Sequence, residues 1–149
     1  MALDGSTASV TVLDLPNRQG GPIIQNALTA ATTVLYAAKL DEDGLDGVDG
    51  AVRSVRRYIR HRQQIGAPVA LREAGIAVGA VRDTIMTLDS RRALRELCAA
   101  YGDMVLKPLI PERVVVKEAR AAGRYYGHYD RGAVVHDAYA ALAREVLDQ

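Results

Sequence analysis

The amino-acid sequence predicts an α/β domain with a partial doubly wound, mostly parallel sheet and helices on both faces, extending over residues 1–149. This fold class follows from the alternation of two patterns along the chain. Short β-branched and apolar runs alternate with stretches in which apolar residues recur at helical spacing. Strands that alternate with helices form parallel sheets covered on both sides. The chain shows no repeat with a period of roughly 20 to 50 residues and no linker, so a single domain is expected.

The first part of the chain predicts strand, helix, strand. Residues Ala8 to Leu15 read ASVTVLDL and end at Pro16, which is typical of a buried strand that leads into a turn. A helix is expected from Pro22 to Ala31, because proline suits a first helical turn and apolar residues then recur at helical spacing. The β-rich run Thr32 to Ala38 predicts the second strand.

The remaining elements continue this alternation. An amphipathic helix is predicted by the apolar stripe Val48, Val52, Val55 and Ile59. A third strand is expected over Ile76 to Val81, and a third helix over Ser90 to Tyr101 with Gly102 in the stop position. Asp103 to Ile110 predicts a fourth strand. The tail from Gly132 predicts a last helix, with the stripe Val135, Ala138, Tyr139, Leu142 and Val146.

Composition and charge exclude several classes of protein. With 49% hydrophobic and 25% charged residues, the chain has the balance of a globular protein. Nineteen basic against eighteen acidic residues argue against a surface built wholly for nucleic acid, so any basic site is a local patch. The lone Cys98 cannot form an internal disulfide and is expected in the core. No apolar stretch reaches the roughly 20 residues of a membrane span, and the cytoplasm is the expected location.

Four separated segments carry motifs in a recognisable order. The first, TVLDLPNRQGGPIIQNALTAA, has an Asp-x-Pro turn at Asp14 and an Asn-Ala-Leu step at Asn26. The others are TVLYAAKLDEDGLDGVDGAV, VLKPLIPERVVVKEARAAG and AYAALAREVL. Their joint order and spacing over residues 8 to 147 resemble the ParA and MinD family of deviant-Walker ATPases. The resemblance implies a P-loop NTPase-like fold that lacks its N-terminal half, and a role in bacterial plasmid or chromosome partitioning.

The sequence departs from this family in three places. It has Ala37 or Ala38 where the family has a proline after the second strand, and Asn17 where the family has a second proline in its Walker B turn. The largest departure is the phosphate-binding loop, which needs several glycines, a lysine and a Ser or Thr hydroxyl. No segment offers that set, and Gly20-Gly21 predicts a simple turn. The expectation is a truncated or split protein that binds ATP and Mg²⁺ only when complemented by a chain carrying the loop.

The resemblance also assigns candidate site residues. It implies that Asp14 holds magnesium and so serves catalysis; the alternative is a carboxylate that caps the next turn. It places Pro111 and Arg113 against the nucleotide base, the alternative being a surface turn. It implies DNA binding by the arginine-rich helix, whose candidate residues are Arg53, Arg56, Arg57 and Arg60. Their alternative is a solvated helix face.

Other clusters and partners complete the set of expectations. The basic and aromatic residues from Arg124 to Arg131 suit either a single-strand binder or a packed loop. The acidic residues from Asp41 to Asp49 are expected to favour a helix N-terminus rather than to bind calcium. The expected partners are a second copy or a complementing N-terminal half, non-specific DNA and a centromere-binding protein. Two rival hypotheses are a small DNA-binding module that works without nucleotide and a non-functional remnant.

Overall fold

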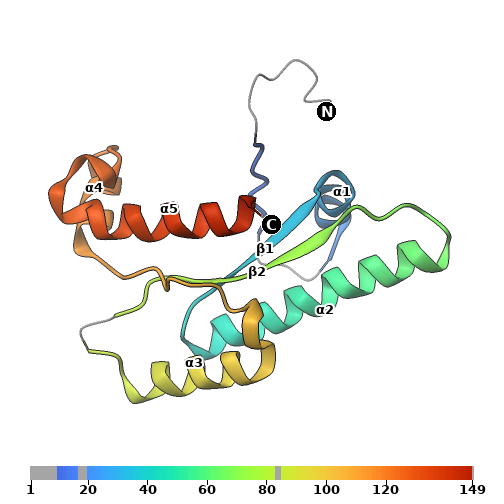
Figure 1. Ribbon diagram of the computed structural model, residues 1–149, viewed down its shortest axis with the longest axis horizontal. Coiled ribbons are helices and arrows are strands. Elements are labelled where there is room, and N and C mark those ends of the chain that lie inside the picture. The colour runs from blue at the N-terminus through green and yellow to red at the C-terminus, as the bar shows by residue number, and fades with distance from the viewer. Residues whose placement is uncertain (1–9, 17–19, 83–84, 149) are drawn as a thin grey trace.

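The computed structural model describes residues 10–16, 20–82 and 85–148 (Figure 1). The elements follow the order α1 (Pro22–Ala30), β1 (Thr33–Ala38), α2 (Glu42–Gln64), β2 (Arg72–Val78), α3 (Leu88–Tyr101), η1 (Gly102–Met104), α4 (Val114–Ala121), η2 (Tyr126–His128), η3 (Asp130–Gly132) and α5 (Ala133–Leu147). The protein is therefore α/β. Among the described residues, no helix is both long enough and apolar enough to cross a membrane.

The two strands form a small parallel sheet. Their register runs from Thr33 opposite Arg72 to Ala38 opposite Val78, with an irregularity after Val34. Gly75 lies next to this irregularity with φ at 142°, and a Cβ there would come within 2.7 Å of both the Leu106 side chain and a backbone carbonyl. A glycine is required at this position because only hydrogen fits.

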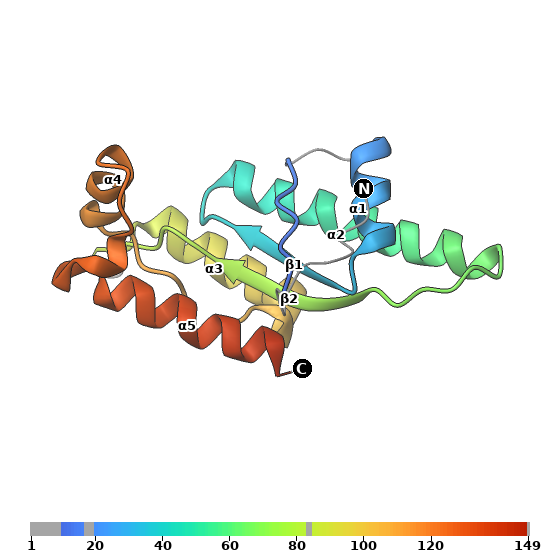
Figure 2. The ribbon, with the colours of Figure 1, turned by 90° about the horizontal axis from the view of Figure 1, so that it is seen from above.

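Helices cover the two faces of the sheet. Figures 1 and 2 show α5 on one side of the strands and α2 with α3 on the other. The larger core lies between the sheet and α2, where Tyr36, Val52 and Ile76 are buried among other apolar residues. A second core under α5 contains Leu106, Ile110, Val135, Ala138 and Leu142. The parallel strands with helices on both sides confirm the coarse fold class.

Local sequence signals explain where the helices begin and end. Pro22 occupies the first turn of α1. The Asp41 side chain caps α2 by accepting a hydrogen bond from the Gly44 N–H at 2.8 Å, and Thr87 caps α3 in the same way. Gly102, with φ at 54°, ends α3 as its position in the sequence predicts. The predicted helices are confirmed, and the structure adds the unpredicted α4.

The predicted first strand is wrong over the residues that the structure describes. Residues 10–16 belong to no helix or strand, and their side chains are exposed, with Val12 at 84%. Ala8 and Ser9 lie outside the described residues. A strand exists only by hydrogen bonding to a neighbour, and none of the described segments pairs with residues 10–15. β1 likewise pairs with β2 alone, so its other edge is open within the described chain.

The predicted fourth strand is also wrong. Residues 102–104 form η1. The following segment meets β2 at the isolated bridge Ile76–Val105 and through the Ile110 N–H, which donates to the Val78 carbonyl at 2.8 Å, and a second isolated bridge, Val81–Pro111, lies just beyond β2. Pro108 has no N–H to donate to a ladder, so a continuous strand cannot form there. The described sheet consequently has two strands, which is smaller than the doubly wound sheet that the sequence predicts.

Candidate nucleic-acid interface

Helix α2 separates its charges along its length. Residues 42–49 include four acidic residues, whereas residues 50–64 include five arginines and no acid. This order places negative charge at the helix N-terminus and positive charge at its C-terminus, which favours the helix dipole. The stripe that faces the core consists of Val48, Val52 and Val55. All four candidate arginines are exposed, so their predicted exposure is confirmed, while their role in DNA binding stays a prediction.

Arg56 is held by the sheet. Its Nε donates to Glu73 Oε2 on β2 at 3.1 Å, and its Nη2 lies 3.4 Å from the Met104 sulfur. The Tyr36 hydroxyl donates to the same carboxylate at 2.8 Å. Burial, followed by this hydrogen bond, raises the pKa of Tyr36. Glu73 therefore joins β1, β2 and α2, and Arg56 belongs to this network rather than to a free basic surface.

Arg53 is paired within its own helix. Its Nη1 donates to Asp49 Oδ2 at 3.0 Å, an exposed pair one turn apart. The Tyr101 hydroxyl donates to the other oxygen of Asp49, and burial followed by this bond raises the pKa of Tyr101 to about 12. An exposed pair at this spacing is worth only about 0.3–0.5 kcal/mol. Arg53 can therefore exchange Asp49 for another anion at little cost.

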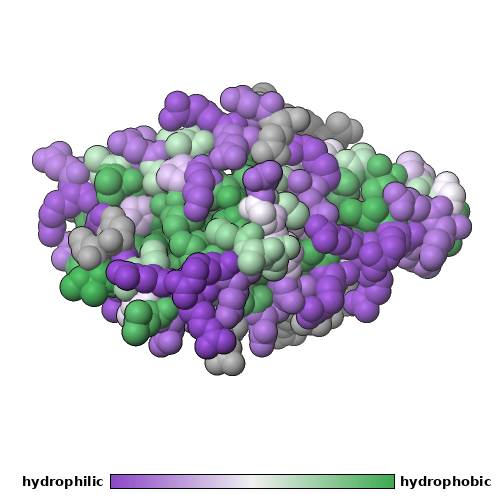
Figure 3. Space-filling view, turned by 60° about the horizontal axis from the view of Figure 1, so that its bottom comes forward, coloured by the Kyte–Doolittle hydropathy of each residue, from purple (hydrophilic) through white to green (hydrophobic). Residues whose placement is uncertain are grey.

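Arg57 and Arg60 are the free members of the row. Neither makes a hydrogen bond or an ion pair with any of the described residues. Figure 3 shows hydrophilic residues prevailing over the half of this face that holds the C-terminal part of α2, while apolar residues gather toward the end where α3 begins. Two uncompensated guanidinium groups in the last three turns of α2 form a local positive patch on a nearly neutral chain.

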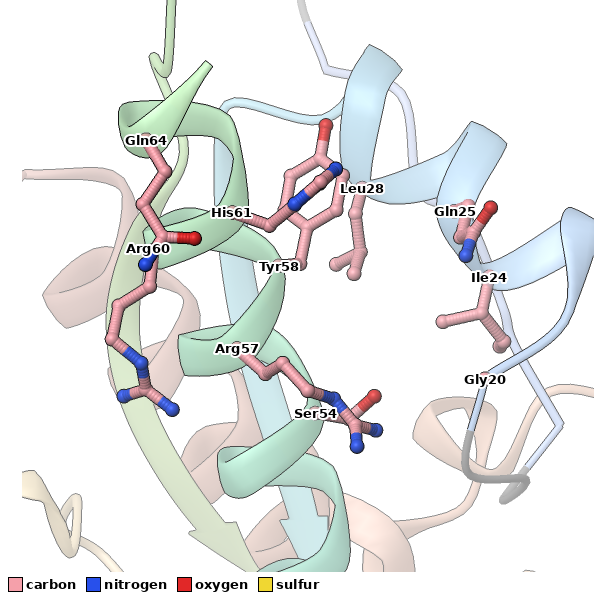
Figure 4. A pocket seen from close by; sticks show the side chains of 10 residues that line it. All are labelled: Gly20, Ile24, Gln25, Leu28, Ser54, Arg57, Tyr58, Arg60, His61 and Gln64. Carbon is pink, nitrogen blue, oxygen red and sulfur yellow. The ribbon is translucent and has the colours of Figure 1, made fainter. Parts of the chain in front are cut away.

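A hollow of about 460 Å³ opens between α1 and α2 (Figure 4). Its lining comes from Gly20, Ile24, Gln25, Leu28, Ser54, Arg57, Tyr58, Arg60, His61 and Gln64. The Tyr58 hydroxyl and the Thr29 Oγ1 lie 2.9 Å apart in a hydrogen bond that ties the two helices together. Figure 4 shows Arg57 extending into the opening beside the hydroxyl of Ser54, opposite Ile24.

Asp14 is separate from this patch. It lies in the exposed segment 10–16, not at the end of a buried strand. Among the described residues, no group of three or more His, Cys, Asp or Glu side chains is placed to hold a metal ion. The role of Asp14 in holding magnesium stays a prediction.

Pro111 and Arg113 follow the sheet at its carboxyl end. Both are half-buried; Pro111 bridges to Val81, and Arg113 Nη1 donates to the Glu112 carbonyl at 2.9 Å. The Glu112 carboxylate accepts hydrogen bonds from Lys117 and Arg82, each at 2.8 Å, and these two bonds lower the pKa of Glu112 to about 2. A smaller hollow of about 270 Å³ opens beside Glu112. Nucleotide binding by Pro111 and Arg113 stays a prediction.

The aromatic residues of the loop before α5 contact one another. The Tyr125 ring lies 4.8 Å from Tyr126 and 5.4 Å, edge-on, from His128, measured between centroids. Tyr126 also approaches Tyr139 of α5, at 6.5 Å. Tyr126 is half-buried while Tyr125 stays exposed, so the cluster combines a packed loop with an exposed ring. It packs against α5, on the other side of the strands from α2.

Several residues around the patch carry no signal in the sequence. Glu73 is one acid within a strand, and Ser54 and Gln25 are ordinary polar residues on helices. Only the packing of α1 and β2 against α2 brings them to the arginines. Glu73 follows Arg72 at the start of a strand whose remaining residues are apolar, and a charge at such a position is tolerated best when it is paired.

Comparisons with known proteins relate the chain to partition proteins. Over 124 residues the chain is 27% identical to the chromosome partitioning protein ParA of Caulobacter vibrioides, covering 83% of this chain and 44% of that protein. Over 127 residues it is 28% identical to the chromosome-partitioning ATPase Soj of Treponema pallidum, covering 85% of this chain and 47% of that protein. No family model matches. The matches support a ParA-like family relationship, and the chain spans less than half the length of these curated relatives.

Proposed function

We propose that this chain is a partition-related protein that attaches to DNA without reading its sequence and depends on another chain for ATP chemistry. The relationship to ParA and Soj supports the partition role. The observation that carries the DNA proposal is the exposed pair Arg57 and Arg60, which have no partner among the described residues. Guanidinium groups make bidentate hydrogen bonds to phosphate, and phosphates repeat along every sequence of DNA.

A salt titration of duplex DNA binding tests this proposal. The affinity should fall linearly with the logarithm of salt concentration, with a slope near −0.9 for each phosphate contacted. Replacing Arg57 and Arg60 together by alanine should flatten that slope by about 1.8. The control replaces Arg131 and Arg144 by alanine, which removes the same charge from the α5 side of the sheet. If both double variants flatten the salt slope equally, or if the chain does not bind DNA at low salt, the arginines of α2 form only a solvated helix face and the DNA proposal is wrong.

The proposal also covers ATP. The sequence offers no glycine-rich loop with a lysine and a hydroxyl, so the purified chain should show no ATP turnover above a protein-free control with Mg²⁺ present. ATP and Mg²⁺ would bind only in a complex with a chain that supplies the loop. Magnesium-dependent turnover that disappears in Asp14→Ala would overturn this part. A reading frame encoding such a loop immediately upstream would favour a split enzyme over a small DNA-binding module.

A partner for the sheet is part of the same proposal. The open edge of β1 and the exposed side chains of Val10, Val12 and Leu13 offer apolar and backbone groups that a further strand would cover. A second copy or a complementing N-terminal half would each supply one. Sedimentation of the chain alone distinguishes them, because a concentration-dependent dimer indicates the second copy.

A further inference from the structure

The hollow between α1 and α2 has two chemically different sides. Ile24 and Leu28 of α1 contribute aliphatic side chains, and the Tyr58 ring from α2 continues this apolar wall (Figure 4). The Tyr58 hydroxyl is occupied by Thr29, which fixes the ring. A volume of about 460 Å³ lies within the usual range of small-molecule sites, roughly 300–1,000 Å³. The hollow is therefore large enough for a ring system with a polar substituent.

The polar side of the hollow suits a phosphate ester. The Arg57 guanidinium has no partner among the described residues, and Figure 4 shows it next to the Ser54 hydroxyl at the opening. A guanidinium fork and a hydroxyl are typical ligands of a phosphoryl group. Gln25 and His61 also line the hollow. A glutamine amide offers a donor and an acceptor together, which is the pattern that pairs with the edge of a nucleobase.

We propose that this hollow binds a nucleoside monophosphate unit, with the phosphate on Arg57 and Ser54 and the base against Ile24 and Leu28. The unit can be a free nucleotide or the 5′ end of a single strand. The site shares Arg57 with the proposed duplex-binding patch. It does not rest on that function, because a ligand seated in the hollow also needs the apolar wall on α1.

Calorimetric titration with adenosine monophosphate tests the site. Ribose 5-phosphate lacks the base and adenosine lacks the phosphate, so each should bind at least about tenfold more weakly if both sides of the hollow are used. A short single strand with a 5′-phosphate, compared with the same strand without it, separates the two sources. Tighter binding of the phosphorylated strand than of the free nucleotide assigns the strand end, and the reverse order assigns the free nucleotide. Equal affinity for all three small ligands, or no heat at all, would overturn the proposal.

Two substitutions with matched controls locate the ligand. Ile24→Phe fills the hollow while keeping every arginine, and its control is Ile23→Phe, because Ile23 is 70% exposed and does not line the hollow. Arg57→Gln removes the guanidinium from an exposed position, and its control is Arg53→Gln. Each hollow variant should weaken nucleotide binding at least about tenfold, and each control should leave it unchanged. Melting curves check that all four variants remain folded.

The outcome for duplex DNA is independent. Ile24→Phe should retain the salt slope of the unmodified chain while losing the nucleotide. Nucleotide binding that survives both Ile24→Phe and Arg57→Gln overturns the hollow site and leaves the DNA proposal standing. Nucleotide binding in a chain that does not bind duplex DNA overturns the DNA proposal and leaves the hollow site standing.

Discussion

Replacing Arg56 by alanine should lower the stability of the fold while leaving its DNA salt dependence almost unchanged. The side chain is 44% exposed, and its partner Glu73 is 20% exposed. A partly exposed pair of this kind contributes about 1 kcal/mol to the free energy of unfolding. For a chain of 149 residues that loss corresponds to a fall of about 3 °C in the melting temperature.

Glu73→Ala should cost more than Arg56→Ala. It removes the acceptor of the Tyr36 hydroxyl as well as the partner of Arg56. A hydroxyl left without a partner on a buried residue adds a desolvation cost, so the total is about 2–3 kcal/mol. Adding Tyr36→Phe to this variant should recover part of the loss, because the unpaired hydroxyl disappears with it.

Urea denaturation and the duplex titration together provide the assay. Arg56→Ala should shift the urea midpoint without changing the slope of the unfolding free energy against urea concentration. In the titration, Arg60→Ala should reduce the salt slope by about 0.9 and Arg56→Ala should not. The reasoning is refuted if Arg56→Ala flattens the salt slope as much as Arg60→Ala and leaves the urea midpoint where it was. Arg56 would then bind phosphate rather than support the sheet.

Three further outcomes follow from the geometry. Gly75→Ala should destabilise the fold by about 2–3 kcal/mol in thermal unfolding, since its Cβ would press on Leu106 from a positive-φ position, whereas equal stability would contradict the close approach. The Glu112 carboxyl should titrate with a pKa of about 2 in a carbon-detected NMR experiment, and in Lys117→Ala this pKa should move toward its ordinary value of 4.5. Because the pKa of Glu112 is lower in the folded than in the unfolded chain, its contribution to stability is present above pH 4.5 and is lost as the pH falls through 2. Leu35→Lys, placed on the open strand β1, should reduce any self-association seen by sedimentation, and an unchanged dimer would locate the contact elsewhere.

The sequence predicts the helices well and the strands only in part. An amphipathic helix such as α2 satisfies its backbone internally, so its apolar period and its capping residue Asp41 suffice to locate it. A strand needs a neighbouring strand to accept and donate its backbone hydrogen bonds, and the local sequence does not identify that partner. Residues 10–15 have a strong β pattern and remain unpaired among the described residues, while Pro108 interrupts the run from Asp103 to Ile110.

The candidate site shows the same division. The sequence places four arginines on one side of a helix, and the structure confirms that they are exposed. Arg56 and Arg57 are adjacent, and the sequence pattern does not distinguish them as candidates for binding phosphate. The fold brings Glu73, which is seventeen residues further along the chain, next to Arg56. Arg56 is therefore paired, and Arg57 has no partner among the described residues. The hollow is likewise invisible in the sequence, because its two walls come from helices separated by β1.

The charge order along α2 has a consequence for how the molecule can be arranged on a surface. A helix of 23 residues is about 34 Å long, whereas the screening length at physiological ionic strength is about 8 Å. Its acidic start, with the exposed Asp43 and Asp46, is thus electrically independent of its basic end. A polyanion held at one end does not neutralise the other. The two ends of α2 can therefore bind two different partners at the same time. A cationic surface can contact the acidic N-terminal end while a polyanion stays bound to the basic C-terminal end.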